Sequence, residues 1–512
     1  MMREWMMRSR SNALAVLVGL LLLLLGQSEA AAFARAQWAR EGWITEFDAG
    51  LTRARAAGRP AFVYFDAGWC SWCQQYKRDT LDQPQVRTVL ARDFVRVAVD
   101  FDARPDLMRR FGGIGLPFTV VLSPDGTVLS RFVGVMQPQD LMEVLGTLAR
   151  QPAPPPALAV APGEVLHQAT SLDRRGYDAF RAAYLQHLES LYDPARETLF
   201  GQFETGVTYR RTSLLAWVYL MERGLWTERA GRAARAERER LWDAVDGGFF
   251  NFIDPTREEY LESSKLLEIN AWMAAWQAQA GAHDPQARRI AVQTWHYLRE
   301  VLWDEANGGF FQAQLADNAY YALAPAERVR RGAPPVERAK RTDTNAQAVW
   351  ALLHLGRFSG DREAIDYAAQ TMDFLLRDMW RDGRLYHLWR DGHRFAPDQP
   401  HSWFWVLAAG AELERVRPDH ARRERLAAIA TDAGRWLEQR MLDAAAARLD
   451  NELAGLIARI AGPPDFYPQL PSGARAWALG QLRIEAETPP DEPVIGLWAW
   501  EEKTDDGGES IK

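Results

Sequence analysis

Two cysteines in one short stretch constrain this chain more than any other feature. An apolar run of β-forming residues, 62–65, ends in Asp66-Ala67-Gly68, and Cys70-Ser71-Trp72-Cys73 follows at the start of a predicted helix. Cys70 and Cys73 are the only cysteines among 512 residues. A disulfide between them would close almost no loop, and a tetrahedral zinc site would need further ligands. Redox chemistry is the use that remains for the pair.

Length and composition predict a multidomain globular chain. A chain of 512 residues is too long for one hydrophobic core, and 47% hydrophobic with 25% charged residues is ordinary for a globular protein. The net charge of −7 gives no reason to expect a nucleic-acid partner. The 21 tryptophans predict a well-filled helical core, with a large aromatic-lined cavity as the alternative.

Residues 1–34 have the pattern of a signal peptide. A stretch with three arginines precedes the apolar run 13–26, and small residues at 28–34 supply cleavage sites. The run is shorter than the roughly 20 apolar residues that cross a bilayer. We therefore expect a periplasmic protein. The alternative is an uncleaved anchor in the inner membrane, with the body of the protein facing the periplasm.

Residues 43–150 predict an α/β domain in the order helix, strand, helix, strand, helix, strand, strand, helix. The expected elements lie at 43–58, 61–65, 71–90, 94–100, 105–111, 118–122, 128–132 and 138–148. The helix at 71–90 contains Pro84, which predicts an interruption there. Ser123-Pro124-Asp125-Gly126 has the composition of a turn between the last two strands.

This order resembles a thioredoxin-fold domain over residues 35–150. The specific features are Trp69-Cys70-Ser71-Trp72-Cys73 at a strand-to-helix junction and Leu116-Pro117 before the final hairpin. The resemblance implies that the bond before Pro117 is cis and that this proline faces the disulfide. It also implies that the backbone of Leu116 pairs with an extended substrate segment.

The placement of the cysteines predicts their roles. At a helix N-terminus, unpaired N–H groups and the helix dipole favour the thiolate of Cys70, which would attack a substrate disulfide. Cys73, one turn further on, would resolve the mixed disulfide. Trp69 and Trp72 would shield the sulfurs and present a flat apolar surface to a partner. No cofactor is expected beyond this redox-active disulfide.

One position departs from the thioredoxin pattern. Thioredoxins typically place a buried aspartate six residues before the first cysteine, where it accepts the proton of the second cysteine. That position is Tyr64 here, and Asp66 lies two residues later on the same side of the strand. Either Asp66 or solvent would take over the role of proton acceptor.

Composition marks two segments as lying outside the folded domains. Residues 151–163 are rich in proline and predict an extended, semi-rigid linker. Residues 488–512 are acidic, and they predict a largely disordered tail.

Residues 164–487 predict an all-α domain with a repeated phrase. Leu-Trp-Asp followed, after three residues, by Gly-Gly-Phe-Phe occurs at 241–250 and 302–311, with looser copies at 191–201 and 379–386. Each copy follows an amphipathic helix and precedes a more continuously apolar one, and the turns at the opposite ends are short. Alternating long and short connections predict a ring of helical hairpins with an outer and an inner layer, an (α/α)6-type toroid.

The toroid resembles the six-hairpin glycosidase and sugar-epimerase barrels. A thioredoxin-like domain followed by such a ring resembles, more narrowly, the spermatogenesis-associated thioredoxin-like protein family and its bacterial relatives. Residues 265–271 (Lys-Leu-Leu-Glu-Ile-Asn-Ala) parallel that family's Lys-Met-Leu-Tyr-Asp-Asn-Ala, and Asp343-Thr344-Asn345 parallels its Asp-Trp-Asn. The family's His-Phe-Glu before the lysine is Glu262-Ser263-Ser264 here, so the chemistry at the mouth of the ring is altered.

Five polar residues are candidates for the mouth of the toroid: Glu262, Lys265, Asn270, Asp343 and Asn345. A glycosidase needs two carboxylates and an epimerase needs acid–base side chains, but no pair here has a spacing that dictates a reaction. For Lys265 and Asn270, a buried polar network that holds the helix ring together is an equal alternative to ligand binding.

Three histidines lie close together in the sequence at 387, 393 and 401. Spacings of six and eight residues do not place them on one helical face, so we expect solvated loop residues and no metal site.

These patterns together predict an exported thiol–disulfide oxidoreductase whose toroid recognises a client or ligand. The expected partners are protein disulfide or dithiol clients, a membrane-bound electron donor, and a glycan or peptide in the toroid. The alternative is a carbohydrate-acting enzyme, glycosidase-like or sugar-epimerase-like, with an accessory thioredoxin domain. A non-catalytic scaffold is the third hypothesis.

Overall fold

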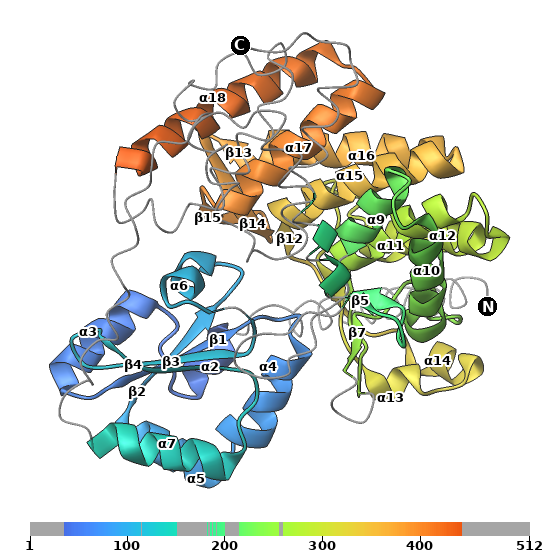
Figure 1. Cartoon of the computed structure of the whole chain (residues 1–512). Coiled ribbons are helices and arrows are strands. Elements are labelled where there is room, and N and C mark those ends of the chain that lie inside the picture. The colour runs from blue at the N-terminus through green and yellow to red at the C-terminus, as the bar shows by residue number, and fades with distance from the viewer. Residues whose placement is uncertain are drawn as a thin grey trace, which may run out of the picture. The chain divides into compact units, whose positions relative to one another are not determined.

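The computed structural model describes residues 35–113, 115–150, 214–254 and 260–442, and those of 182–199 other than 183–184, 187 and 191 (Figure 1). The described residues fall into two compact units. The first holds 35–101, 111–150 and 328–338, and the second holds 102–110 with the rest from 182 onward. The expected signal peptide, linker and acidic tail lie outside the described residues. Within the described part of the chain, no helix has both the length and the apolarity to cross a membrane.

The first unit is built on a four-stranded sheet in the order β2-β1-β3-β4. Its strands are β1 (Ala61–Asp66), β2 (Val95–Asp100), β3 (Phe118–Leu122) and β4 (Val128–Val133). β1 runs parallel to β2 and antiparallel to β3, and β4 is antiparallel to β3. These are the strands that residue pattern predicts, each within one residue at either end.

The helices of this part of the chain also follow the prediction. They are α2 (Arg35–Arg40), α3 (Phe47–Ala57), α4 (Ser71–Tyr76), a π-helical turn (Lys77–Leu81), α5 (Pro84–Asp93), α6 (Pro105–Arg110) and α7 (Pro138–Arg150). The expected interruption of the helix at 71–90 occurs before Pro84, which begins α5 as its first residue. Sequence pattern did not predict α2.

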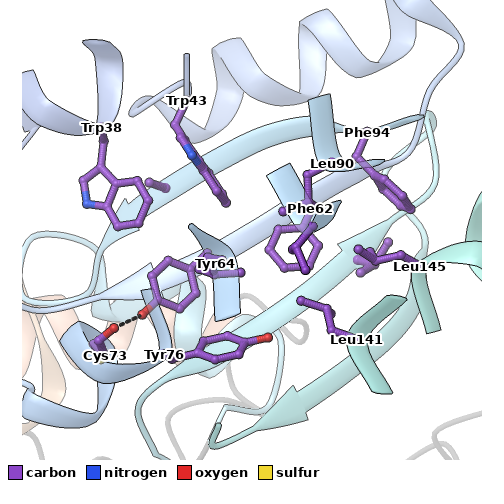
Figure 2. Close-up of a cluster of buried hydrophobic side chains, with 14 of the residues drawn as sticks. Trp38, Trp43, Phe62, Tyr64, Cys73, Tyr76, Leu90, Phe94, Leu141 and Leu145 are labelled. Atoms are coloured by element: carbon purple, nitrogen blue, oxygen red, sulfur yellow. Dashed lines mark hydrogen bonds between the residues drawn. The ribbon is translucent and has the colours of Figure 1, made fainter. Parts of the chain in front are cut away.

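The sheet separates two packed faces. Phe62 and Tyr64 of β1 belong to the buried cluster beneath α4, α5 and α7, which Figure 2 shows. Figure 2 also places Trp38 and Trp43, from the N-terminal segment, on this face. On the other face, the Phe65 ring lies 5.3 Å from that of Phe118. The dithiol segment therefore sits over a core rich in aromatic rings.

The second unit consists of helical hairpins in two layers. In the described residues the inner helices are α9 (Leu214–Glu222), α11 (Leu267–Ala280), α15 (Thr342–Ser359) and α17 (Pro400–Val416). Their outer partners are α10 (Thr227–Leu241), α12 (Pro285–Tyr297), α16 (Arg362–Phe374) and α18 (His420–Leu442). The inner helices pack side by side in chain order, and each one packs on its outer partner. This is the layered arrangement of the predicted toroid (Figure 1).

The inner layer is the core of this unit. Every residue of α11 except Glu268 is buried, and the Trp217 ring of α9 stacks on the Trp276 ring of α11 at 5.8 Å. Trp217, Trp276 and Trp295 are fully buried, which favours the core interpretation of the many tryptophans.

The long connections contain short strands and helices. The strands are β5 (Tyr192–Asp193), β6 (Thr198–Leu199), β7 (Phe252–Asp254), β8 (Tyr260–Glu262), β9 (Lys265–Leu266), β10 (Ala313–Gln314), β11 (Val336–Glu337), β12 (Lys340–Arg341), β13 (Trp380–Arg381), β14 (Arg384–Arg390) and β15 (His393–Pro397). The helices are α13 (Asn318–Tyr321) and α14 (Pro325–Arg331). π-Helical turns at Leu298–Leu302 and Leu375–Met379 extend α12 and α16.

The repeated phrase forms a recurrent loop. Trp242 pairs with Phe249 across an isolated antiparallel bridge, and Trp303 pairs with Phe310 in the same way. Gly248 has a φ of +78°, and a Cβ at this position would lie 2.8 Å from the Tyr297 ring. A left-handed backbone and a close aromatic ring together explain the glycine pair of the motif.

Candidate functional site

Cys70 and Cys73 form a disulfide at the start of α4, with their Cα atoms 5.2 Å apart. Cys70 is the residue that caps the helix, in an extended conformation. Its carbonyl oxygen accepts the N–H groups of Cys73 and Gln74 at 3.1 and 3.2 Å. The chain therefore enters the helix at Cys70, and this geometry places both sulfurs on the first turn.

A backbone donor lies against the first sulfur. The N–H of Cys73 donates to Cys70 Sγ at 3.1 Å. A hydrogen bond of this kind is stronger to a thiolate than to a thiol, so it favours the charged form of Cys70. Cys70 is 5% exposed and Cys73 is 0% exposed, so the first sulfur is the one with access to a partner.

Three of the predicted supporting residues pack near the disulfide. Trp69, Trp72 and Leu116 are half-buried and pack against the cluster that contains both cysteines. The Leu116–Pro117 peptide bond is cis, as the resemblance implied.

Tyr64 contacts the second cysteine through the backbone. Its hydroxyl donates to the carbonyl oxygen of Cys73 at 3.1 Å, as Figure 2 shows. Burial raises the pKa of Tyr64 well above its usual value, and the nearby Asp66 carboxylate adds to this effect. The hydroxyl therefore stays protonated at neutral pH and cannot accept a proton from Cys73.

Asp66 is a buried carboxyl group at the end of β1, on the same face as Tyr64. It is 4% exposed, and the indole N–H of Trp38 donates to its Oδ2 at 3.1 Å. Its Oδ1 accepts no hydrogen bond from the described residues. Burial raises the pKa of Asp66 to about 7, and the charge of Asp100 reinforces this rise. The hydrogen bonds from Trp38 and from the Ala67 backbone oppose it, as does the charge of Lys77.

Trp38 is a site residue that sequence reasoning missed. It lies on α2, 28 positions before Asp66, and Lys77 Nζ lies 5.0 Å from its ring centroid. Lys77 in turn forms ion pairs with Glu41 at 2.8 Å and Asp82 at 2.9 Å. The signal available in the sequence is a tryptophan in a largely polar stretch just before the first predicted helix, 43–58.

In the second unit, Lys265 and Asn270 belong to a buried polar network. Lys265 Nζ lies 2.8 Å from Asp243 Oδ2 and donates to the carbonyl of Gly247 at 2.6 Å. Asn270 accepts the N–H of Phe249 at 2.6 Å and donates to its carbonyl at 3.1 Å. These contacts fix the repeated loop, as the network alternative predicted.

Asn345 belongs to a second copy of this network. It accepts the N–H of Phe310 at 2.7 Å and donates to its carbonyl at 3.0 Å. Lys340 Nζ lies 2.5 Å from Asp304 Oδ2 and donates to the carbonyl of Gly308 at 2.7 Å. Sequence reasoning missed Lys340, although it precedes Asn345 by five residues, just as Lys265 precedes Asn270.

The two acidic candidates, Glu262 and Asp343, have other partners. Glu262 is buried at the end of β8, where its Oε1 accepts the N–H of Ser264 at 3.3 Å. Asp343 accepts two bonds from Arg341, at 3.2 Å from Nε and 2.6 Å from Nη2.

The expectation of a solvated loop was wrong for His387. It is buried on β14, and its Nδ1 lies 2.9 Å from Ser402 Oγ and 3.7 Å from Asp343 Oδ1. Strand pairing with β12 and β15 buries this position, which histidine spacing could not reveal. His393 is exposed on β15, and no three potential metal ligands gather anywhere in the described residues.

Comparisons with known proteins agree with the geometry of the first unit. Residues 42–124 match the family model described as thioredoxin-like. The thiol:disulfide interchange protein DsbD of Ralstonia nicotianae is 32% identical over 119 residues, which cover 22% of this chain and 19% of that protein. Spermatogenesis-associated protein 20 of Homo sapiens is 28% identical over 100 residues, 18% of this chain and 12% of that protein. The chain thus spans less than a fifth of the length of these relatives.

Among solved structures, cellobiose 2-epimerase from Spirochaeta thermophila is similar over 65% of this chain and 97% of its own, with a TM-score of 0.49 and 15% identity. The helical layers described above establish the architecture of the second unit from its own packing. Residues 42–124 are therefore similar to the thioredoxin-like family, and helical hairpins in two layers follow them in the chain.

Proposed function

We propose that this protein is a thiol–disulfide oxidoreductase that acts through Cys70 and Cys73. The observation that carries the proposal is the disulfide at the start of α4, with a backbone N–H 3.1 Å from the sulfur of Cys70. Similarity to the Ralstonia relative, a thiol:disulfide interchange protein, supports the same chemistry.

The proposed reaction has two steps in the direction of substrate reduction. The Cys70 thiolate attacks one sulfur of a substrate disulfide, so that a mixed disulfide forms and one substrate thiolate leaves. The Cys73 thiol then loses its proton, and its thiolate attacks Cys70 Sγ and displaces the second substrate thiolate. The substrate gains two electrons, the Cys70–Cys73 pair is oxidised, and the released thiolates take up protons.

We propose further that the protein is exported to the periplasm, where it exchanges electrons with protein clients and a membrane-bound donor. The toroid would recognise the client, or bind a glycan or peptide as its own ligand. Lys265 and Asn270 make buried bonds to the repeated loop, which favours a structural role for them.

Insulin reduction by the full chain with dithiothreitol tests the proposal. Cys70→Ala should abolish the turnover, and Cys73→Ala should accumulate a mixed disulfide through Cys70. Turnover retained in the Cys70→Ala variant would overturn the proposal.

The reduction potential of the pair sets the direction of electron flow. A value near that of thioredoxin, about −270 mV, would indicate a reductase supplied by a donor, and one near −120 mV an oxidant.

A further inference from the structure

We propose that Trp38 of α2 positions Asp66 as the proton acceptor of the dithiol, by holding one carboxyl oxygen and leaving the other for exchange with Cys73. The inference rests on the proposed oxidoreductase function and assigns a positioning residue to it. The position that holds the buried aspartate in thioredoxins carries Tyr64 here, so a proton acceptor in this chain must lie at another position and have other contacts.

The contacts of Asp66 are those expected of a group that is held in place and still able to take a proton. The Trp38 indole donates to Oδ2 at 3.1 Å, the backbone N–H of Ala67 also bonds the carboxyl group, and Oδ1 accepts no hydrogen bond of normal geometry from the described residues. A buried carboxyl group with an unpaired oxygen is costly in a fold, so its retention calls for an explanation. Proton exchange at Oδ1 supplies one.

The position of Asp66 fits this role. It shares one face of β1 with Tyr64, whose hydroxyl contacts the Cys73 backbone at 3.1 Å. Trp38 belongs to the same buried cluster as Cys70 and Cys73, and its ring lies 5.6 Å from that of Tyr64. The face that carries the carboxyl group is therefore the face that carries the cysteines.

A second set of contacts holds Trp38 itself. Lys77, in the turn that continues α4, lies over the Trp38 ring at 5.0 Å and pairs with Glu41 of the chain just after α2. Helix α2 is thus fixed both to the end of β1 and to the helix that carries Cys73. This arrangement connects the acceptor and the thiol through one aromatic ring.

The charged and titratable groups around Asp66 determine how it responds to pH. Asp100 lies opposite it in the register of β2, Lys77 lies on the turn after α4, and Tyr64 lies on β1 itself. Asp100 raises the pKa of Asp66, whereas Lys77 and the Trp38 hydrogen bond lower it. Removal of the indole N–H should therefore raise the pKa, with the other three groups unchanged.

The test follows the second step of the reaction in the reduced full-length protein. Glutathione disulfide is added, samples are quenched with acid, and mass spectrometry measures the decay of the Cys70 mixed disulfide across a pH series. The decay rate should rise with a midpoint near pH 7, the pKa of Asp66. Trp38→Phe should move the midpoint upward by about one unit and slow the decay at pH 7 about three- to tenfold.

Trp43→Phe is the matched control, because Trp43 is buried in the same cluster and its ring lies 5.0 Å from that of Trp38. Its midpoint should equal that of the unaltered protein. If Trp38→Phe and Trp43→Phe give the same midpoint, the positioning role of Trp38 is wrong. If Asp66→Asn keeps a midpoint near pH 7 while Cys70→Ala abolishes exchange, the proposed oxidoreductase function is supported and the acceptor role of Asp66 is wrong.

A measurement on the unaltered protein keeps the inference testable should Trp38→Phe fail to fold. The indole N–H resonance of Trp38 should titrate with a midpoint near pH 7 and lose this titration in Asp66→Asn. The Trp43 resonance should show no such dependence. A Trp38 resonance that is constant from pH 5 to 9 would overturn the proposal.

Discussion

The two units bury charged groups in opposite ways. In the toroid, Lys265 is fully buried, with Asp243 at 2.8 Å, the Gly247 carbonyl at 2.6 Å and three aromatic rings around it. In the thioredoxin-like unit, Asp66 is also buried, but its hydrogen bonds come from the Trp38 indole and the Ala67 backbone, and its Oδ1 accepts none of normal geometry from the described residues.

This difference distinguishes a buried charge that stabilises the fold from a buried group that can take part in proton transfer. A fully satisfied ion pair rigidifies its surroundings, so it stabilises the fold. The carboxyl group of Asp66, which is only partly hydrogen-bonded, has its pKa raised to about 7 and can gain or lose a proton near neutral pH. Variants that remove one partner of a satisfied ion pair should destabilise the fold. Variants that replace the partly satisfied carboxyl group with a neutral side chain should stabilise it.

Lys265→Met tests the structural half of this comparison and should have the largest effect. It removes the ammonium group that pairs with the buried Asp243 carboxylate, which should lower the free energy of unfolding of the toroid by about 3–5 kcal/mol. Calorimetry of the full chain measures this change, while insulin reduction should be unaffected. The double variant Lys265→Met with Asp243→Leu should recover much of the loss. A single variant with unchanged unfolding would contradict the structural role.

Asp66→Asn tests the chemical half, with an effect of opposite sign. The pKa of Asp66 is raised from 3.8 to about 7 on folding, so the folded state binds the extra proton between about pH 4 and 7. The free energy of unfolding therefore falls as pH rises through that window. At pH 8, where the ionised group is buried, Asp66→Asn should stabilise the unit by about 2–4 kcal/mol.

Urea unfolding at pH 8 and pH 5 measures this difference, with alkylation of the buried thiol of Cys73 in the reduced protein as the probe. At pH 5 the gain should be small, because the carboxyl group is already protonated in the folded state. Equal effects at the two pH values would show that Asp66 does not titrate in this range.

Local patterns predicted the thioredoxin-like unit well because its signals are adjacent in the chain. The strand before Asp66, the cysteine pair and Leu116-Pro117 each carry their own backbone preference, and the structure confirms all three elements. Trp38 escaped prediction because its partner is 28 residues away, and nothing in a short window connects an indole to a distant carboxyl group.

In the toroid too, contacts between residues that are far apart in the sequence escaped prediction. The repeated phrase predicted helical hairpins, but not that its aspartate would pair with a lysine from the segment before the next inner helix. The shared five-residue spacing of Lys265 with Asn270 and Lys340 with Asn345 was the available signal. His387 was mispredicted because its burial depends on neighbouring strands rather than on its own surroundings in sequence.

Asn270→Ala should have an intermediate effect on the toroid. The asparagine side chain makes three hydrogen bonds, two to Phe249 and one to the Leu266 carbonyl at 2.9 Å. Its removal leaves buried backbone groups unpaired, which should lower the free energy of unfolding by about 2–3 kcal/mol. Asn345→Ala, in the second copy, should lose a similar amount by calorimetry. A loss in only one of the two variants would mean that the copies are not equivalent.

Tyr64→Phe should have the smallest effect, and it distinguishes the two polar residues on the same face of β1. The change removes the hydroxyl that donates to the Cys73 carbonyl at 3.1 Å, which should lower the free energy of unfolding by about 1 kcal/mol. Because the pKa of Tyr64 is well above its usual value, its hydroxyl does not titrate near neutrality. The pH midpoint for decay of the Cys70 mixed disulfide should therefore remain near 7, set by Asp66. A shifted midpoint would instead mean that Tyr64 takes part in the proton transfer. Asp66 alone would then not account for the pH dependence of the decay.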